Sequence, residues 1–245
     1  MTEAPCRLLE WDTQFFGYRV ARVEAQRIDA STCEAVLAWC RHRQVTCLYF
    51  LAAADDAETV RVSEQAGFAF VDIRLVLALD LERSALGDIA TRDGTAFRDA
   101  IPADVPALER IAADVHRDSR FFFDARVPRE RAEALYTTWI RRSILEGFAD
   151  HVIVAEVDGA VRGYVTGRRE ADGTGSIGLI GVSAEARGRS VGSNLVRASL
   201  TRFASDGIKR VTVVTQGRNV GAQRTYQRAG FLSHSVRLWY HKWFQ

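Results

Sequence analysis

One segment constrains the fold more than any other: an apolar run that passes through a turn of glycine and arginine directly into a helix. The run 180–183 is strand-like, and a helix is expected over about 190–205. The turn between them carries Arg187, Gly188 and Arg189. Successive backbone N–H groups in such a turn, backed by a helix N-terminus, form a cradle for an anion, and glycine lets the backbone approach oxygen closely. The residues alone therefore leave two interpretations: a diphosphate or polyanion site, or a plain strand–helix turn.

The rest of the chain alternates between strand and helix patterns. Strands are expected at 47–53, 68–81, 151–157, 161–170, 176–183, 210–215 and 231–242, and helices at 31–43, 55–66, 104–116, 128–145, 190–205 and 220–229. Asp158-Gly159 is a strong hairpin signal between two of the strands. The pattern predicts a mixed α/β fold with a largely antiparallel sheet flanked by helices.

Two blocks are expected, with residues 84–95 as the linker between them because glycine and aspartate gather there. Residues 46–78 lie on 209–241 without a gap, and both stretches have the order strand, loop, helix, Ala-Gly-Phe, strand. We interpret the N-terminal block as a truncated, degenerate copy of the C-terminal fold. It should form a short sheet ending in the strand 68–81 and hold no cofactor.

The glycine-arginine turn resembles the coenzyme A pyrophosphate loop of GNAT acetyltransferases, (Gln/Arg)-x-x-Gly-x-(Gly/Ala). Arg187 stands at the first position and Gly192 at the last, while Ser190 stands where a glycine is usual. The resemblance implies a GNAT fold over 92–245, with a smaller degenerate GNAT-like domain over 1–88. It also implies that acetyl-CoA is held by the strand and the turn, through Ile180, Val182, Arg187, Gly188, Arg189, Ser190, Val191, Gly192 and Ser193.

A second motif of the same family follows downstream. The stretch from Asn219 to Phe231 is similar to the family's Asn-x-x-Ala-x-x-x-Tyr-x-x-x-Gly-Phe. Ala222 and Tyr226 are four residues apart, on one helix face. The resemblance implies that Asn219 reaches the cofactor arm, that small Ala222 leaves room for it, and that the Tyr226 phenol is the general acid. The alternative is that Tyr226 only packs the helix on the sheet.

Two further stretches, 9–23 and 119–140, resemble GNAT enzymes that acetylate the 4-amino group of a TDP-4-amino-4,6-dideoxyhexose. This resemblance implies that Arg120 and Phe121 lie beside the acceptor, with Arg120 suited to a nucleotide diphosphate. The alternative is that Phe121–Phe123 anchor a loop in the core. Direct attack by the sugar amine is expected, with His116, His151 and Glu170 as candidates for a base. Two other functions stay open: a GNAT enzyme with another amine acceptor, and a non-catalytic acyl-CoA-binding module.

Composition limits the partners. The net charge of +2, from 33 basic and 31 acidic residues, is too balanced for a generic nucleic-acid binder. No apolar run approaches the roughly 20 residues of a membrane span, and no signal peptide is evident, so a cytoplasmic protein with no membrane partner is expected. The four cysteines form no CxxC pair, so we expect buried packing and no metal. A homodimer stays open.

Overall fold

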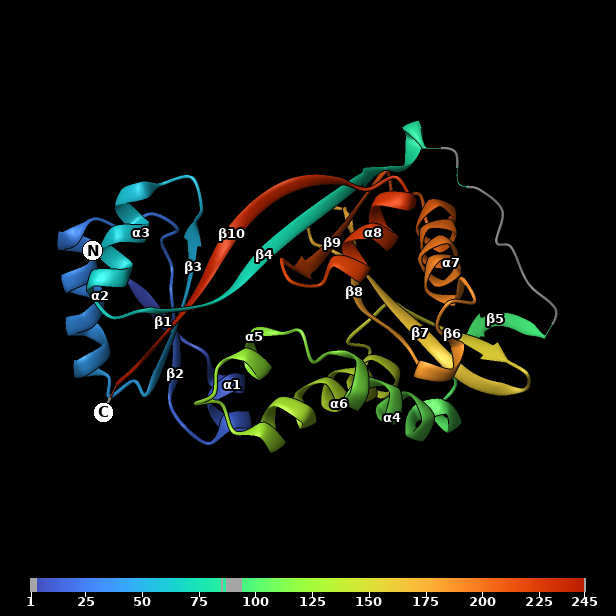
Figure 1. Cartoon of the computed structure of the whole chain (residues 1–245), viewed down its shortest axis with the longest axis horizontal. Coiled ribbons are helices and arrows are strands. Elements are labelled where there is room, and N and C mark those ends of the chain that lie inside the picture. The colour runs from blue at the N-terminus through green and yellow to red at the C-terminus, as the bar shows by residue number, and fades with distance from the viewer. Residues whose placement is uncertain (1–3, 85, 87–93, 245) are drawn as a thin grey trace.

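The computed structural model describes residues 4–84, 86 and 94–244. Its strands form one ten-stranded sheet in the order β1-β2-β3-β10-β4-β9-β8-β7-β6-β5 (Figure 1). The elements are, in chain order, β1 (Cys6–Leu8), α1 (Glu10–Phe16), β2 (Val20–Val23), α2 (Ala30–His42), β3 (Cys47–Ala53), α3 (Ala57–Gln65), β4 (Ala69–Asp80), β5 (Thr95–Asp99), α4 (Val105–Val115), α5 (Arg120–Phe123), α6 (Arg129–Leu145), β6 (His151–Val157), β7 (Ala160–Arg169), β8 (Gly175–Val182), α7 (Val191–Ser205), β9 (Arg210–Gln216), α8 (Val220–Arg228) and β10 (Leu232–Trp243).

Most neighbouring strands are antiparallel, as the sequence predicted, and the mixed α/β fold class is confirmed. The parallel pairs are β2 with β3 and β8 with β9. The β6–β7 hairpin turns through Asp158 and Gly159, both with positive φ (53° and 76°), which is the turn that such a pair favours. Within the described ranges, no helix is both long enough and apolar enough to cross a membrane.

The long strands β4 and β10 lie side by side and join the two ends of the molecule (Figure 1). Here the structure differs from the sequence-based expectation. The strand predicted to end a separate N-terminal sheet, β4, does not pair with β3; it lies between β10 and β9, while β10 pairs with β3. Each block therefore contributes its last strand to the other block, because both strands are long enough to cross the junction. The predicted linker lies mostly outside the described residues, as does the boundary between 88 and 92, so the domain division stays a prediction.

The exchanged strands follow the internal repeat residue by residue. One constant shift carries β3, α3 and β4 onto β9, α8 and β10. The same shift turns the pair Leu51–Trp239 into the pair Val214–Val76, and both pairs are present. Arg74 pairs directly with its own counterpart Arg237. The register supports the interpretation of the N-terminal block as a copy of the C-terminal one.

Three apolar clusters hold these elements together. The largest lies between the sheet and α7 and α8, a second lies under α1, α4, α5 and α6, and a third lies under α2 and α3. All four cysteines are buried and free. Cys33 and Cys40 pack in the third cluster, which confirms their predicted structural role.

Candidate active site

Strand β8 separates from β9 partway along its length. The two strands pair only from Gly175 to Ile177, whereas β8 stays paired with β7 as far as Val182. The backbone of Ile180–Val182 therefore has one edge without a strand partner, and buried backbone groups need such partners. The separation leaves room for an extended ligand to lie against this edge.

A cavity of about 460 Å³ occupies this opening. Its walls come from the end of β8, the following turn and α8, with one residue from α4. They are Val115, Ile180, Gly181, Val182, Arg187, Gly188, Gly192, Asn219, Gly221, Ala222, Thr225 and Tyr226. The two motifs, separated by about thirty residues of helix and strand, are thus brought to one cavity.

The turn before α7 has the backbone of an anion cradle. Gly188 has a φ of 75° and Ser190 a φ of 61°, so two left-handed residues reverse the chain within three positions. Ser190 is the N-cap of α7, yet its side chain makes no capping hydrogen bond. The first N–H groups of α7 are therefore left without a side-chain cap, and such groups bind phosphate.

The turn contributes only some of its predicted residues to the cavity. Arg187, Gly188 and Gly192 line it. A Cβ added to Gly192 would meet only Val182, at 3.6 Å. Arg189 instead forms an ion pair with Asp158 at 2.9 Å. Val191 is 1% exposed and packs in the core, and Ser190 and Ser193 do not line the cavity.

Helix α8 supplies the wall opposite the turn. Its N-cap is Asn219, whose side-chain oxygen accepts a hydrogen bond from the Ala222 N–H at 3.0 Å. Tyr226 is 3% exposed, and its ring packs on Phe231. Burial raises the pKa of Tyr226, so its phenol stays protonated at neutral pH and can donate a proton into the cavity.

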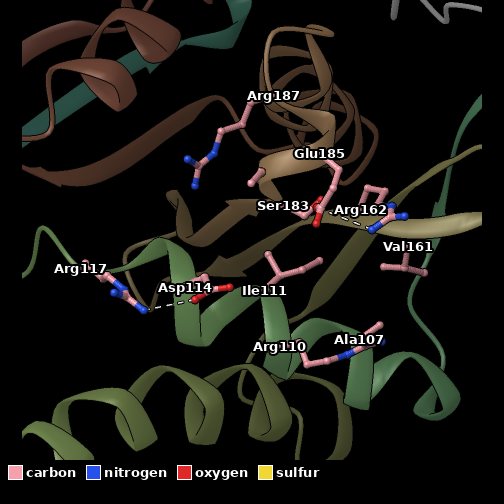
Figure 2. Close-up of a pocket in the computed structure, with 11 residues that line it drawn as sticks. Ala107, Arg110, Ile111, Asp114, Arg117, Val161, Arg162, Ser183, Glu185 and Arg187 are labelled. Carbon is pink, nitrogen blue, oxygen red and sulfur yellow. Dashed lines mark hydrogen bonds and ion pairs between the residues drawn. The ribbon is translucent and has the colours of Figure 1, made fainter.

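A second cavity of about 560 Å³ adjoins the first and shares Arg187 with it (Figure 2). It lies between α4 and the ends of β7 and β8. Arg117 pairs there with Asp114 at 3.3 Å, and Arg162 with Glu185 at 3.6 Å. Figure 2 shows the Arg187 side chain reaching over this space from the turn. Sequence reasoning missed Arg162, because only the β7–β8 register brings it beside the turn.

Arg120, predicted beside an acceptor, is half-buried in an aromatic cage. Its guanidinium carbon lies 4.1 to 4.3 Å from the ring centroids of Tyr49, Phe121 and Trp239. Its Nη1 donates to His241 Nε2 at 2.8 Å. Phe121 itself is 5% exposed and stacks on Phe16. Phe121 is thus packed in the core, as the core-anchor alternative predicted for it, and contacts Arg120 with its ring face. Phe123 is 55% exposed, so that alternative does not hold for all of Phe121–Phe123.

His241 holds Arg120 in place. Its Nδ1 lies 2.6 Å from Asp124, which also accepts a hydrogen bond from the Trp243 indole at 2.9 Å. Burial lowers the pKa of His241 to about 4 despite the Asp124 carboxylate. Neutral His241 therefore donates from Nδ1 and accepts from Arg120 at Nε2. No pattern in the sequence points to this chain of contacts, because it depends on β10 lying next to β3.

The three candidate bases lie in different places. His116 follows the cavity residue Val115, stacks on Tyr136 and bonds the Tyr164 hydroxyl at 2.8 Å; burial lowers its pKa to about 4. His151 bonds Ser199 and packs on Phe203. Neither His151 nor Glu170 lines the cavity beside Tyr226. His116 does not line it either, although it directly follows Val115, which does.

Comparison with known proteins gives a consistent result. The model of the "Acetyltransferase (GNAT) family" matches residues 107–231. Over 239 residues, and 96% of each chain, the sequence is 27% identical to the "dTDP-fucosamine acetyltransferase" of Escherichia coli O6:H1 strain CFT073. It is 31% identical to the "Spore coat polysaccharide biosynthesis protein SpsD" of Bacillus subtilis, over 58% of this chain and 48% of that protein. The fold is similar to the crystal structure of a GCN5-related N-acetyltransferase from Sphaerobacter thermophilus, with a TM-score of 0.69 and 18% identity, covering 97% of this chain and 76% of the other.

Proposed function

Because this chain belongs to the acetyltransferase (GNAT) family and is an acyltransferase, we propose that it transfers the acetyl group of acetyl-CoA to the amino group of a nucleotide-linked amino sugar, a TDP-4-amino-4,6-dideoxyhexose. The observation that carries the proposal is the cavity in which the free edge of β8, the turn before α7 and Tyr226 meet. The acceptor class rests on similarity to an enzyme named for dTDP-fucosamine along nearly the whole chain. A role in polysaccharide biosynthesis goes with this acceptor.

The residues of the cavity fit acetyl-CoA, whose thioester supplies an activated acetyl group. The turn at Gly188 and Gly192 presents backbone N–H groups and no bulky side chain, which suits a pyrophosphate. The free edge of Ile180 and Val182 suits an extended chain of amides. Ala222 has a small side chain, so the part of α8 that lines the cavity leaves room for the cofactor.

The groups around the reacting atoms each have a separate role in the reaction. A backbone N–H near Val182 stabilises the negative charge on the acetyl oxygen as the amine attacks. Tyr226 gives its phenolic proton to the sulfur as the carbon–sulfur bond breaks and the carbon–nitrogen bond forms. The proton lost from the amine passes to solvent, from which Tyr226 is reprotonated.

Two other functions compete with this proposal. A GNAT enzyme acting on a polyamine would need an acidic acceptor region, whereas α5 and the start of α6 carry Arg120, Arg129 and Arg131. A non-catalytic acyl-CoA-binding module would not need Tyr226 on the cavity wall.

The test is the release of free CoA from acetyl-CoA with TDP-, UDP- and GDP-linked amino sugars as acceptors. We expect turnover with the TDP-4-amino sugar well above that with a polyamine or a peptide N-terminus. Binding of acetyl-CoA without CoA release for any amine would contradict catalysis. Turnover with a peptide but with no amino sugar would contradict the acceptor.

A further inference from the structure

Two arginines face each other across the centre of the sheet. Arg74 of β4 and Arg237 of β10 are direct antiparallel partners, so their side chains leave the same face of the sheet. Like charges placed directly opposite each other destabilise a sheet. Neither side chain has an ion pair with a carboxylate among the described residues, and both are partly exposed.

The same face carries two more arginines. Arg22 of β2 is aligned with Tyr49 of β3, which pairs with His241 of β10 on this face. Arg120 lies over Tyr49 and Trp239 of the same face. We call Arg22, Arg74, Arg120 and Arg237 the arginine cluster. Burial lowers the pKa of Arg74, and the charged groups that lower it further are the other three members of the cluster.

The carboxylates near the arginine cluster are already bonded to other side chains or lie at the edge of the cluster. Asp72 is on the same strand as Arg74, but it is 3% exposed and is paired with Arg218 at 3.7 Å. Asp124 is bonded to His241 and Trp243. Asp12 influences Arg22 and Arg120 electrostatically without an ion pair to either in the described part of the chain. The centre of the cluster thus has an excess of positive charge, and none of the carboxylates that the structure describes covers it.

The cluster begins one strand away from the proposed acetyl site. Arg74 is the direct partner of Gln216, the last residue of β9, and Asn219 of the cavity follows three positions later. Neighbouring strands are about 4.8 Å apart. Arg74 therefore lies about one strand spacing and Arg237 about two spacings from β9. A sugar ring between the reacting amine and the phosphates would bring the phosphates over this pair.

We propose that Arg74 and Arg237, with Arg120 at their edge, form the site for the diphosphate of the acceptor. This inference rests on the proposed function and specifies which surface recognises the nucleotide half of the substrate. Two guanidinium groups match the two negative charges of a diphosphate diester, and their planar donors suit its oxygens. Binding of the diphosphate would relieve the repulsion between Arg74 and Arg237.

The experiment is calorimetric titration of the full chain with thymidine diphosphate and, separately, with acetyl-CoA. We expect Arg74→Gln and Arg237→Gln each to weaken thymidine diphosphate binding about 10- to 100-fold, as for a lost charge-assisted hydrogen bond. Their affinity for acetyl-CoA, which carries its own diphosphate, should not change. The melting temperature should stay the same or rise, since each variant removes a like-charge contact. Arg83→Gln is the matched control, because Arg83 is an 87% exposed arginine paired with Asp80 away from the cluster.

The outcomes separate this site from the proposed function. Loss of thymidine diphosphate binding in both cluster variants, with the control unaffected, would support the site even if no acetyl transfer were found. A wild-type chain that acetylates an amino sugar but does not bind thymidine diphosphate would overturn the site and leave the proposed function in place. An equal loss of acetyl-CoA affinity in both variants would also overturn it, because the arginines would then serve the cofactor.

Discussion

The two copies of the strand–helix–strand unit, β3–α3–β4 and β9–α8–β10, have the same backbone plan. Each is preceded by a parallel strand and a helix, β2 with α2 and β8 with α7, and the copies differ in the loop between that strand and that helix. In the C-terminal copy, residues 183–190 join β8 to α7 and leave a cavity in front of α8. In the N-terminal copy, residues 24–29 join β2 to α2 and bond to the chain around α3. The Gln26 carbonyl accepts from the Ala53 N–H at 2.8 Å, and Arg27 pairs with Asp55 at 2.9 Å.

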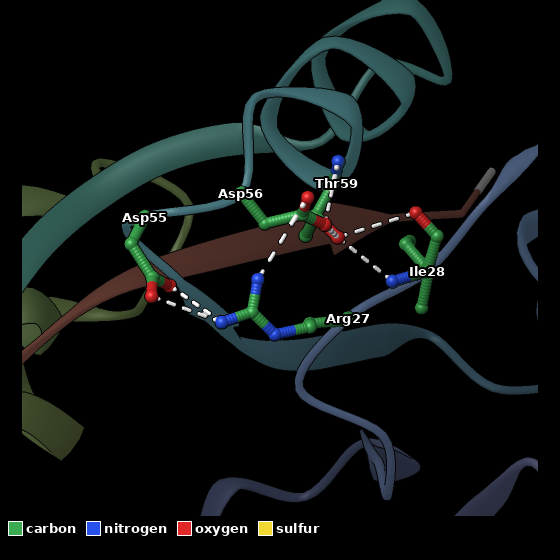
Figure 3. A network of polar contacts seen from close by, with 5 residues as sticks. All are labelled: Arg27, Ile28, Asp55, Asp56 and Thr59. Carbon is green, nitrogen blue, oxygen red and sulfur yellow. Dashed lines mark hydrogen bonds and ion pairs between the residues drawn. The ribbon is translucent and has the colours of Figure 1, made fainter.

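The helix starts show the same contrast. Asn219 caps α8 and Asp56 caps α3 at the equivalent position. The residue three positions later is Ala222 on the cavity wall in one copy and buried Thr59 in the other. The Thr59 hydroxyl donates to the Asp56 carboxylate and accepts from the Ile28 N–H at 2.8 Å, and its oxygen lies 3.2 Å from the Ile28 carbonyl oxygen (Figure 3).

This difference is what we expect if the N-terminal block is a copy that kept the fold without a site. The N-terminal loop has no glycine, and it closes against the helix start where the C-terminal loop stands away. At the position of Tyr226 the N-terminal copy has buried Ser63, whose hydroxyl donates to the Thr59 carbonyl at 2.6 Å. The strand register is the same in the two copies, whereas the N-terminal copy has internal hydrogen bonds where the C-terminal copy has the cavity and the Tyr226 phenol. We therefore propose that the N-terminal copy packs against the active one and binds no cofactor.

The largest expected effect comes from the position where the copies differ in chemistry. Tyr226→Phe keeps the ring and removes the proton donor, so kcat should fall about 10²- to 10⁴-fold while acetyl-CoA affinity stays nearly unchanged. The equivalent change in the other copy, Ser63→Ala, should leave kcat as it is. Steady-state rates and calorimetry measure both quantities. A Phe variant that retains most of the wild-type kcat, with chemistry limiting turnover, would remove Tyr226 from the reaction.

The next largest effect should follow from making the active copy resemble the closed one. Ala222→Thr places the Thr59 side chain on the cavity wall, where extra atoms cost about 1–3 kcal/mol. We expect acetyl-CoA affinity to fall about 5- to 100-fold with little change in melting temperature. Gln227→Thr, on the exposed side of the same helix, is the matched control for helix propensity. Unchanged affinity in Ala222→Thr would mean that the cofactor does not pass α8 at this point.

Local patterns predicted most elements, and register explains what they missed. Strand and helix periodicity predicted the elements from 31 to 81 and from 104 to 243 within a few residues, except the short helix α5. The cavity residues of β8, the turn and α8 followed from two motifs, because each motif lies within one continuous segment. The short strands β1 and β2 were not predicted, since three or four residues carry too little alternation.

Contacts between distant segments could not be predicted in this way. β4 and β10 are equivalent strands, and each could pair with either β3 or β9. Local sequence patterns do not show which of these pairings is more stable. Tyr49, Trp239 and His241 meet around Arg120 only because β10 lies beside β3. The facing pair Arg74 and Arg237 was visible as a match in the internal repeat, but its position at the centre of the sheet was not.

A smaller effect, on stability and not on catalysis, is expected in the closed copy. Thr59→Ala removes the partner of the buried Ile28 N–H, and an unsatisfied buried donor costs about 1–3 kcal/mol. Chemical denaturation should show this loss in the free energy of unfolding, with kcat and acetyl-CoA affinity unchanged under native conditions. Thr59→Ser keeps the hydroxyl and should recover most of the stability. If the Thr59→Ala variant bound acetyl-CoA at its N-terminal copy, Thr59 alone would be what prevents binding there. That result would contradict the proposal that several differences between the copies prevent it.

The smallest expected effect concerns the loop that stays open. Ser190 holds a left-handed backbone that costs a residue with a Cβ about 1–2 kcal/mol, and glycine avoids this cost but loses more entropy on folding. Ser190→Gly should therefore stabilise the chain by up to about 1 kcal/mol, or roughly 2–4 °C in melting temperature. Ser190→Ala keeps the strain and should show no such gain. Both variants remove the hydroxyl, so a common loss of acetyl-CoA affinity would show that the hydroxyl meets a phosphate. We expect both affinities to stay close to that of the wild type, because the hydroxyl caps nothing in the turn and the uncapped N–H groups of α7 are the donors. A Gly variant less stable than the wild type would contradict the left-handed turn, and with it the anion cradle on which the contrast between the two loops depends.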